Sequence, residues 1–147
     1  MTARIFILNG PNLNRLGTRE PELYGFETLA DLQERCKTRC SELGMELDFR
    51  QTNFEGEFVE SIHDAIDNAS GLIVNPAGLT FGSVPVMDAL KMFDGPKIEL
   101  HITNVHAREG VYHNSLMSKV VTAVIAGLGT EGYLHALNWM ANATRQS

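Results

Sequence analysis

The stretch RIFIL at residues 4–8, followed by NGP at residues 9–11, decides the fold. Its continuous apolar side chains predict a strand buried on both faces, and Asn-Gly-Pro is a turn signal that ends it. A second run, GLIV at residues 71–74, has the same form and stops at Asn-Pro, residues 75–76. Such strands are typical of parallel sheets that helices cover on both sides.

The rest of the chain alternates between helical and strand-like patterns. Apolar residues at helical spacing predict four helices, at residues 28–43, 57–69, 83–93 and from 131 onward. Further strands are expected at residues 45–51, 97–102 and within 120–125. We therefore expect a single domain over residues 1–147, an α/β three-layer sandwich of the flavodoxin-like type with a parallel five-stranded sheet.

Composition limits the classes of partner. The 147 residues are 44% hydrophobic and 20% charged, with a formal net charge of -6 and no Lys/Arg cluster, so we expect no nucleic-acid partner. No apolar run is long enough to span a bilayer, and we expect a cytoplasmic protein with no membrane partner. An acidic protein that binds an anionic metabolite must concentrate positive charge locally, so single arginines matter.

Cys36 and Cys40 lie four residues apart on a predicted helix. Helix geometry holds their backbones too rigidly for an easy disulfide, and two thiols alone make a poor zinc site. We expect two half-buried thiols in a reducing compartment.

Three loops with unusual polar content follow predicted strands, at residues 9–25, 75–83 and 101–108. Ligands of such folds bind beyond the carboxyl ends of the strands, so these loops should converge. The first is long and contains Asn12 and Tyr24 among its arginines. An ordinary surface loop remains one interpretation and a flavin phosphate cradle another, although the loop lacks a run of serines and threonines.

The string LNGPNLNRLGTREPELYG at residues 8–25 resembles the N-terminal signature of type II 3-dehydroquinate dehydratases. The resemblance continues, in the same order, through QTNFEG at 51–56, NPAG at 75–78, IELHITNVHARE at 98–109 and GLGTEGY at 127–133. It implies a hydro-lyase that removes a proton next to a ketone, passes through an enolate and expels a β-hydroxyl as water. It also implies that no cofactor or metal takes part, and that the substrate is a small carboxylate.

The resemblance assigns catalytic roles residue by residue. Tyr24 matches the general base, and Arg19 and Arg108 match the cations that favour its phenolate form. His101 matches the acid that protonates the departing hydroxyl, and Glu99, two residues earlier on the same strand face, matches its orienting partner.

Other positions match groups that hold the substrate or the intermediate. Asn12 matches the residue that holds a water against the developing enolate oxygen. Asn75 matches a substrate-positioning amide, and Ile102 and Thr103 match the segment that holds the substrate carboxylate. Asp88 matches a residue that reaches a neighbouring subunit's site, in an assembly of trimers that combine into a dodecamer.

The distal substrate pocket departs from the family pattern. Phe81 stands where the family has a histidine, and Tyr112 stands where it has an arginine. Leu79, Met87 and Phe54 replace a tyrosine, an arginine and a histidine respectively. Because hydroxyls lose hydrogen bonds in an apolar site, these changes raise the hypothesis of a different acid, less hydroxylated or more apolar at that end.

Four functions stay open on the sequence alone. They are dehydration of 3-dehydroquinate, dehydration of another cyclic acid by a substrate-shifted paralogue, non-catalytic binding of a carboxylate metabolite and, as the most distant, flavin binding by a flavodoxin. A pure binder has no need of a base and an acid together, which argues against the third. We expect His106 and His113 to be structural or exposed, and Tyr133 and Trp139 to belong to the core.

Overall fold

The computed structural model describes residues 2–18 and 20–145, with the backbone alone at Leu23 and Tyr24. Its centre is a parallel sheet of five strands in the order β2-β1-β3-β4-β5. The strands are β1 (Arg4–Asn9), β2 (Glu46–Gln51), β3 (Gly71–Asn75), β4 (Lys97–His101) and β5 (Ala123–Ala126). The predicted parallel five-stranded sheet is confirmed, and its strand order is that of flavodoxin-like folds.

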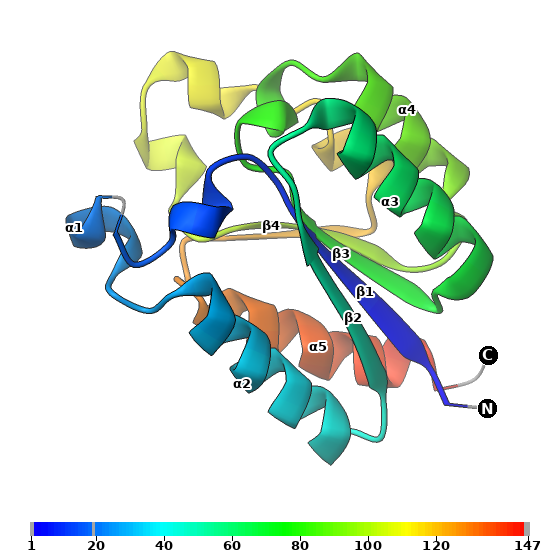
Figure 1. Cartoon of the computed structure of the whole chain (residues 1–147). Coiled ribbons are helices and arrows are strands. Elements are labelled where there is room, and N and C mark those ends of the chain that lie inside the picture. Colours follow the sequence, from blue (N-terminus) through cyan, green and yellow to red (C-terminus); the bar gives the residue numbers. More distant parts are fainter. Residues whose placement is uncertain (1, 19, 146–147) are drawn as a thin grey trace.

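Helices cover both faces of the sheet (Figure 1). Helices α2 and α5 lie on one face and α3 and α4 on the other, while the short α1 stands apart near the loop that follows β1. Their bounds are α1 (Pro21–Tyr24), α2 (Leu29–Glu42), α3 (Glu55–Asn68), α4 (Val84–Met92) and α5 (Glu131–Ala143). Within residues 2–18 and 20–145, no helix has the length and apolarity needed to cross a membrane.

The alternation of side chains along β1 builds two cores from one strand. Ile5 and Ile7 face the layer of α2 and α5, whereas Phe6 and Leu8 face the layer of α3 and α4. All four are at most 1% exposed. Full burial of such a side chain contributes roughly 1.5–3 kcal/mol, so a strand apolar on both faces is stable only between two helical layers.

Local signals set where the helices begin. Thr28 caps α2 through a capping box, in which its hydroxyl accepts from Asp31 N at 3.1 Å and the Asp31 carboxylate accepts from Thr28 N at 3.1 Å. These bonds hold the pKa of Asp31 below its usual value. Ser83 caps α4 by accepting from Val86 N at 3.1 Å, and Pro85 occupies the first turn.

Several details differ from the sequence-based expectations. Helix α3 begins two residues earlier than expected, and β5 begins only at Ala123. Cys36 and Cys40 are fully rather than half buried, and burial raises the pKa of their thiols to about 12 and about 11. The prediction that Trp139 belongs to the core is wrong, since its side chain is 41% exposed.

The position of Trp139 on α5 explains the error. The inner face of that helix consists of Gly132, Tyr133, Ala136, Leu137 and Met140, which follow helical spacing. Residue 139 falls outside that series, so its ring is turned from the sheet. Tyr133 belongs to the core, as expected.

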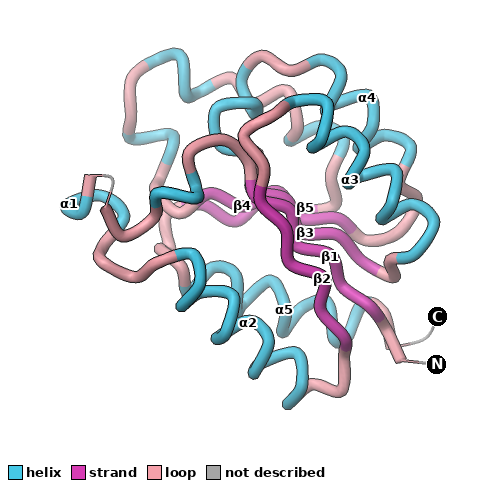
Figure 2. Tube along the Cα trace, in the orientation of Figure 1, coloured by secondary structure: helices cyan, strands magenta, loops and turns pink. Residues whose placement is uncertain are grey.

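The loops after β1, β3 and β4 gather at one end of the molecule, as the tube in Figure 2 shows. They contain short 3-10 helices at residues 13–15, 77–81, 105–107 and 110–113. This end of a parallel sheet carries the ligand sites of open α/β folds.

Candidate active site

A cavity of about 220 Å³ opens where these loops meet. It lies beyond the carboxyl ends of β1, β3 and β4. Eight of the predicted site residues line it: Asn12, Asn75, Phe81, His101, Ile102, Thr103, Arg108 and Tyr112. Segments far apart in the sequence therefore supply one polar pocket with an apolar wall.

His101 and Glu99 form a buried pair at the end of β4. The distance from His101 Nε2 to Glu99 Oε2 is 2.5 Å, and the side chains are 5% and 1% exposed. Because an ionised carboxylate only accepts hydrogen bonds, Nε2 carries the hydrogen in this contact. The other ring nitrogen, Nδ1, is then the one that can exchange a proton with a molecule in the cavity.

Two serines hold the Glu99 carboxylate from behind. Ser115 Oγ donates to Oε2 at 2.9 Å, and Ser118 Oγ donates to Oε1 at 2.7 Å. Burial raises the pKa of the Glu99 carboxyl, but the hydrogen bonds from His101, Ser118 and Ser115 outweigh it, and the net shift is downward. The hydrogen bonds therefore favour the ionised form of the Glu99 carboxyl.

Asn75 is fixed by a buried chain of hydrogen bonds. Its Nδ2 donates to the Tyr133 hydroxyl at 2.9 Å, and that hydroxyl donates to Asn9 Oδ1 at 2.7 Å. Asn75 Oδ1 accepts from Ala77 N at 3.2 Å. Hydrogen bonds at its nitrogen and at its oxygen thereby fix the orientation of the Asn75 amide at the cavity wall. Full burial raises the pKa of Tyr133, which keeps its hydroxyl protonated as a donor.

Asn12 has a left-handed backbone with φ of 74°, which is unusual for a residue other than glycine. Its backbone N–H donates to Asn53 Oδ1 at 2.9 Å. Gln51 Nε2 donates both to Asn53 Oδ1 at 3.1 Å and to Gly10 O at 3.2 Å. The loop after β2 thus holds the loop after β1 in the shape that puts Asn12 at the cavity.

Phe81 and Tyr112 make the apolar wall. Their ring centroids are 5.3 Å apart and the rings are perpendicular, a favourable edge-to-face contact. Phe81 also stacks beside His101, with centroids 6.1 Å apart and an interplanar angle of 24°. The Arg108 Cζ lies over the Tyr112 ring, 3.9 Å from its centroid.

Four of the predicted site residues do not line the cavity among the described side chains. Arg19 lies outside the described residues, and Tyr24 is placed only by its backbone, at the last residue of α1. Glu99 lies behind His101. Asp88 is exposed on α4 and makes a weak ion pair with Lys91 at 3.8 Å.

Sequence reasoning missed residues that support the site. Ser115 and Ser118 hold Glu99, yet they fall in a segment without periodicity, so no local signal indicated them. Tyr133 and Asn53 lie within the family-like blocks at 127–133 and 51–56, which could have pointed to them. His113, expected to be structural or exposed, is exposed and donates from Nε2 to Arg108 O at 2.5 Å.

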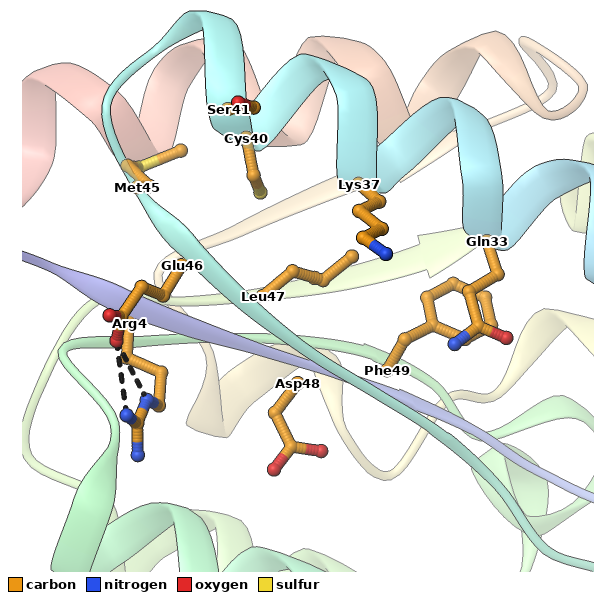
Figure 3. A pocket seen from close by; sticks show the side chains of 10 residues that line it. All are labelled: Arg4, Gln33, Lys37, Cys40, Ser41, Met45, Glu46, Leu47, Asp48 and Phe49. Atoms are coloured by element: carbon orange, nitrogen blue, oxygen red, sulfur yellow. Dashed lines mark hydrogen bonds and ion pairs between the residues drawn. The ribbon is translucent and has the colours of Figure 1, made fainter.

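A larger cavity, about 600 Å³, lies elsewhere, between α2 and the edge strand β2. Figure 3 shows Gln33, Lys37 and Cys40 reaching down from the helix toward Leu47 and Phe49 of the strand. Its charged groups include an Arg4–Glu46 pair at 3.0 Å that solvent reaches. It contains no acid–base pair like that of Glu99 and His101, so its size does not make it the better candidate.

The fold and the smaller cavity together define an α/β protein with a buried acid–base pair at the carboxyl edge of a parallel sheet. The model of the class II dehydroquinase family matches residues 3–141, and the chain belongs to that family. The resemblance inferred from the motifs is thus confirmed.

Individual relatives agree over nearly the full length. The 3-dehydroquinate dehydratase of Bartonella henselae is 50% identical over 140 residues, covering 95% of each chain. The crystal structure of a type II dehydroquinase from Propionibacterium acnes superimposes with a TM-score of 0.94 at 44% identity, covering 97% of this chain and 98% of that one. A type II dehydroquinase from Butyrivibrio crossotus gives a TM-score of 0.92 at 36% identity, covering 96% and 98%.

Proposed function

We propose that this chain is a hydro-lyase that converts 3-dehydroquinate into 3-dehydroshikimate, the reaction for which its curated relatives are named. The observation that supports this most directly is the buried Glu99–His101 pair facing a cavity with Asn12, Asn75 and Arg108. Such a pair supplies a proton donor where a hydroxyl must leave.

The proposed reaction consists of two proton transfers, one from the substrate to Tyr24 and one from His101 to the departing hydroxyl. The Tyr24 phenolate takes a proton from the carbon next to the ketone, and the electrons of that C–H bond move into an enolate. A water held by Asn12 stabilises the enolate oxygen. The enolate then collapses, the bond to the β-hydroxyl breaks, and His101 Nδ1 gives its proton to the departing oxygen, which leaves as water.

The remaining residues bind and orient. Ile102 and Thr103 hold the substrate carboxylate, and Asn75 positions the ring through an amide fixed by Tyr133. Arg19 and Arg108 favour the phenolate form of the base by their positive charge. Glu99 acts through His101, by orienting its ring.

An ultraviolet assay tests the proposal, because the product is a conjugated enone that absorbs where the substrate does not. We expect turnover of 3-dehydroquinate that Tyr24→Phe and His101→Ala each reduce by about 10²- to 10⁴-fold, the usual contribution of general acid–base catalysis. His106→Ala is the matched control, since His106 does not line the cavity. Absence of turnover by the folded wild type would overturn the proposal.

A second candidate function rests on the aromatic wall. Phe81 and Tyr112 contact each other where the family pattern has a histidine and an arginine, so the distal end of the cavity is apolar. This favours a cyclic acid with fewer hydroxyls. If 3-dehydroquinate is the wrong substrate, the double change Phe81→His with Tyr112→Arg should raise its turnover; no gain would count against this candidate.

We also propose a homo-oligomer of trimers that assemble into a dodecamer and work in the cytoplasm. Large exposed hydrophobic side chains support burial between copies: Phe26, Phe54, Val84, Met92, Val111, Val124, Leu128 and Trp139. The free buried thiols of Cys36 and Cys40 fit a reducing compartment. Light scattering coupled to size-exclusion chromatography would test the assembly, and a monomer at micromolar concentration would contradict it.

A further inference from the structure

The buried Glu99–His101 pair stands between two cavities. On one side is the cavity of about 220 Å³ in which the proposed substrate binds, and His101 lines it. On the other side is a second cavity of about 450 Å³, whose lining includes His101 again, together with Glu99, Ser115 and Ser118. The groups that hold Glu99 from this rear cavity therefore also set how the His101 ring faces the substrate.

The direction of the Glu99 carboxylate depends on its hydrogen bonds. The last torsion of a glutamate side chain has only broad preferences, so its rotamer alone does not fix where the two oxygens point. Here Oε1 accepts from Ser118 Oγ at 2.7 Å, while Oε2 accepts from Ser115 Oγ at 2.9 Å and meets His101 Nε2 at 2.5 Å. A serine at each oxygen fixes the carboxylate plane, and Oε2 is thereby aimed at His101.

The two serines are themselves anchored. Ser115 Oγ accepts from the backbone N–H groups of Met117 at 3.0 Å and Ser118 at 3.2 Å, which closes a tight turn. The Met117 side chain is fully buried in the core beside α3 and α4. Leu116 N donates to Thr80 O at 3.0 Å and joins this turn to the loop after β3. Residues 115–118 thus form a firm support rather than a loose surface turn.

This support acts on one half of the proposed reaction. The base Tyr24 belongs to the loop at residues 9–25 and acts first, when the enolate forms. His101 acts afterwards, when the carbon–oxygen bond breaks and the hydroxyl takes the proton from Nδ1. Since the serines contact Glu99, and Glu99 contacts His101, their effect reaches the second step and not the first.

We propose that Ser118, together with Ser115, is a positioning residue for the elimination half of the reaction, which keeps His101 aimed at the departing hydroxyl through Glu99. The inference rests on the proposed function, which assigns that step to His101. Neither serine lines the substrate cavity. Without Ser118 the enolate should still form, but it should return to the substrate more often before the hydroxyl leaves.

Turnover in heavy water separates the two halves. Once the proton on Tyr24 has exchanged with solvent, an enolate that returns gives substrate with deuterium next to the ketone, whereas an enolate that eliminates gives product. We expect Ser118→Ala to lower kcat by about 10-fold, less than the roughly 10²- to 10⁴-fold that a general acid contributes, because Ser115 still holds Glu99. The ratio of deuterated substrate to product should rise.

Matched variants make this result decisive. Ser118→Thr keeps the hydroxyl and should restore most of the rate, since the side chain is exposed and the extra methyl group has space. Ser41→Ala, exposed on α2, should leave both kcat and the ratio unchanged. A lower kcat of Ser118→Ala with an unchanged ratio would overturn the proposal, because the serine would then support both halves alike. An unchanged kcat would overturn it as well.

The orienting role can also be measured without turnover, which separates it from the proposed function. In nitrogen NMR spectra of the imidazole rings, His101 of the wild type should carry its hydrogen on Nε2, the atom that meets Glu99. We expect Ser118→Ala to raise the share of the Nδ1–H tautomer and Ser41→Ala to leave it unchanged, with His101→Ala assigning the signals. If the wild type does not turn over 3-dehydroquinate, the proposed function fails, and this spectrum still decides whether the serines orient His101. An unchanged tautomer would show that they do not.

Discussion

The Tyr133 hydroxyl lies 2.9 Å from Asn75 Nδ2, joining a fully buried residue of α5 to an amide at the wall of the cavity. The same hydroxyl donates to Asn9 Oδ1 at 2.7 Å. One oxygen therefore connects the carboxyl ends of β1 and β3 to the last helix. A residue that belongs to the core by burial belongs to the site by its hydrogen bonds.

Tyr133→Phe should weaken both stability and activity. The change leaves Asn75 Nδ2 and Asn9 Oδ1 buried without this partner, and such an unsatisfied group costs about 1–3 kcal/mol. We expect a loss of that size in the free energy of unfolding by urea titration, together with a lower kcat as Asn75 loses its orientation. Asn142→Ala, exposed on the same helix, should stay within about 0.5 kcal/mol of wild type. An unchanged kcat would show that Tyr133 does not contribute to the function of the site.

Ser118→Ala should destabilise the protein in a pH-dependent way. The pKa of Glu99 is lowered from 4.5 in the folded state, so its contribution to stability is fully present above that value. It is lost as pH falls through the lowered folded pKa. At pH 7 we expect the free energy of unfolding of Ser118→Ala to be about 1.5–3 kcal/mol lower than that of the wild type, as is typical of losing a hydrogen bond to a charged group. This difference should become smaller at low pH, as Glu99 is protonated. For the control Ser41→Ala, which is exposed on α2, the difference from wild type in the free energy of unfolding should be the same at pH 7 and pH 3. A pH-independent difference for Ser118→Ala would refute the linkage.

Ala77→Gly should stabilise the protein. Ala77 has a φ of 53°, in the left-handed region where a Cβ costs roughly 1–2 kcal/mol, partly offset by the entropy that glycine loses on folding. We expect a net gain of about 0.5–1 kcal/mol in chemical denaturation. The comparison variant is Ala107→Gly, where φ is not positive and the same replacement should destabilise. A loss at both positions would contradict the strain argument.

Gly10→Ala should disrupt the cavity end of the sheet. A Cβ there would lie 2.3 Å from the Pro76 carbonyl oxygen, which is backbone and cannot turn aside. The loops after β1 and β3 would have to separate, breaking the hydrogen bond from Gly10 N to Asn75 O at 2.8 Å. We expect a melting temperature several degrees lower and weak turnover, from a destabilisation of ~2 kcal/mol or more. Gly56→Ala, with open space inside α3, should be neutral or stabilising by up to ~1 kcal/mol.

The helices and strands were predictable because their signals are local. Thr28 and Ser83 are N-cap residues that mark where α2 and α4 begin. The apolar run at residues 4–8 requires a core on both faces of the strand. The error at Trp139 has a different cause. The prediction for Trp139 rested on its large aromatic side chain, whereas the helical spacing of the buried residues of α5 leaves position 139 off the inner face.

The sequence by itself determined the parallel sheet, the family and the positions that carry chemical groups, because periodicity and long motifs are readable one segment at a time. Only the tertiary structure decided how those groups act together. The serines behind Glu99, the Tyr133 hydroxyl under Asn75 and the Tyr112 ring under Arg108 all reach their partners through space. Contacts between separate loops, or across a turn with no periodic pattern, depend on backbone angles and on shifts in position of about an ångström. The order of residues alone does not specify either.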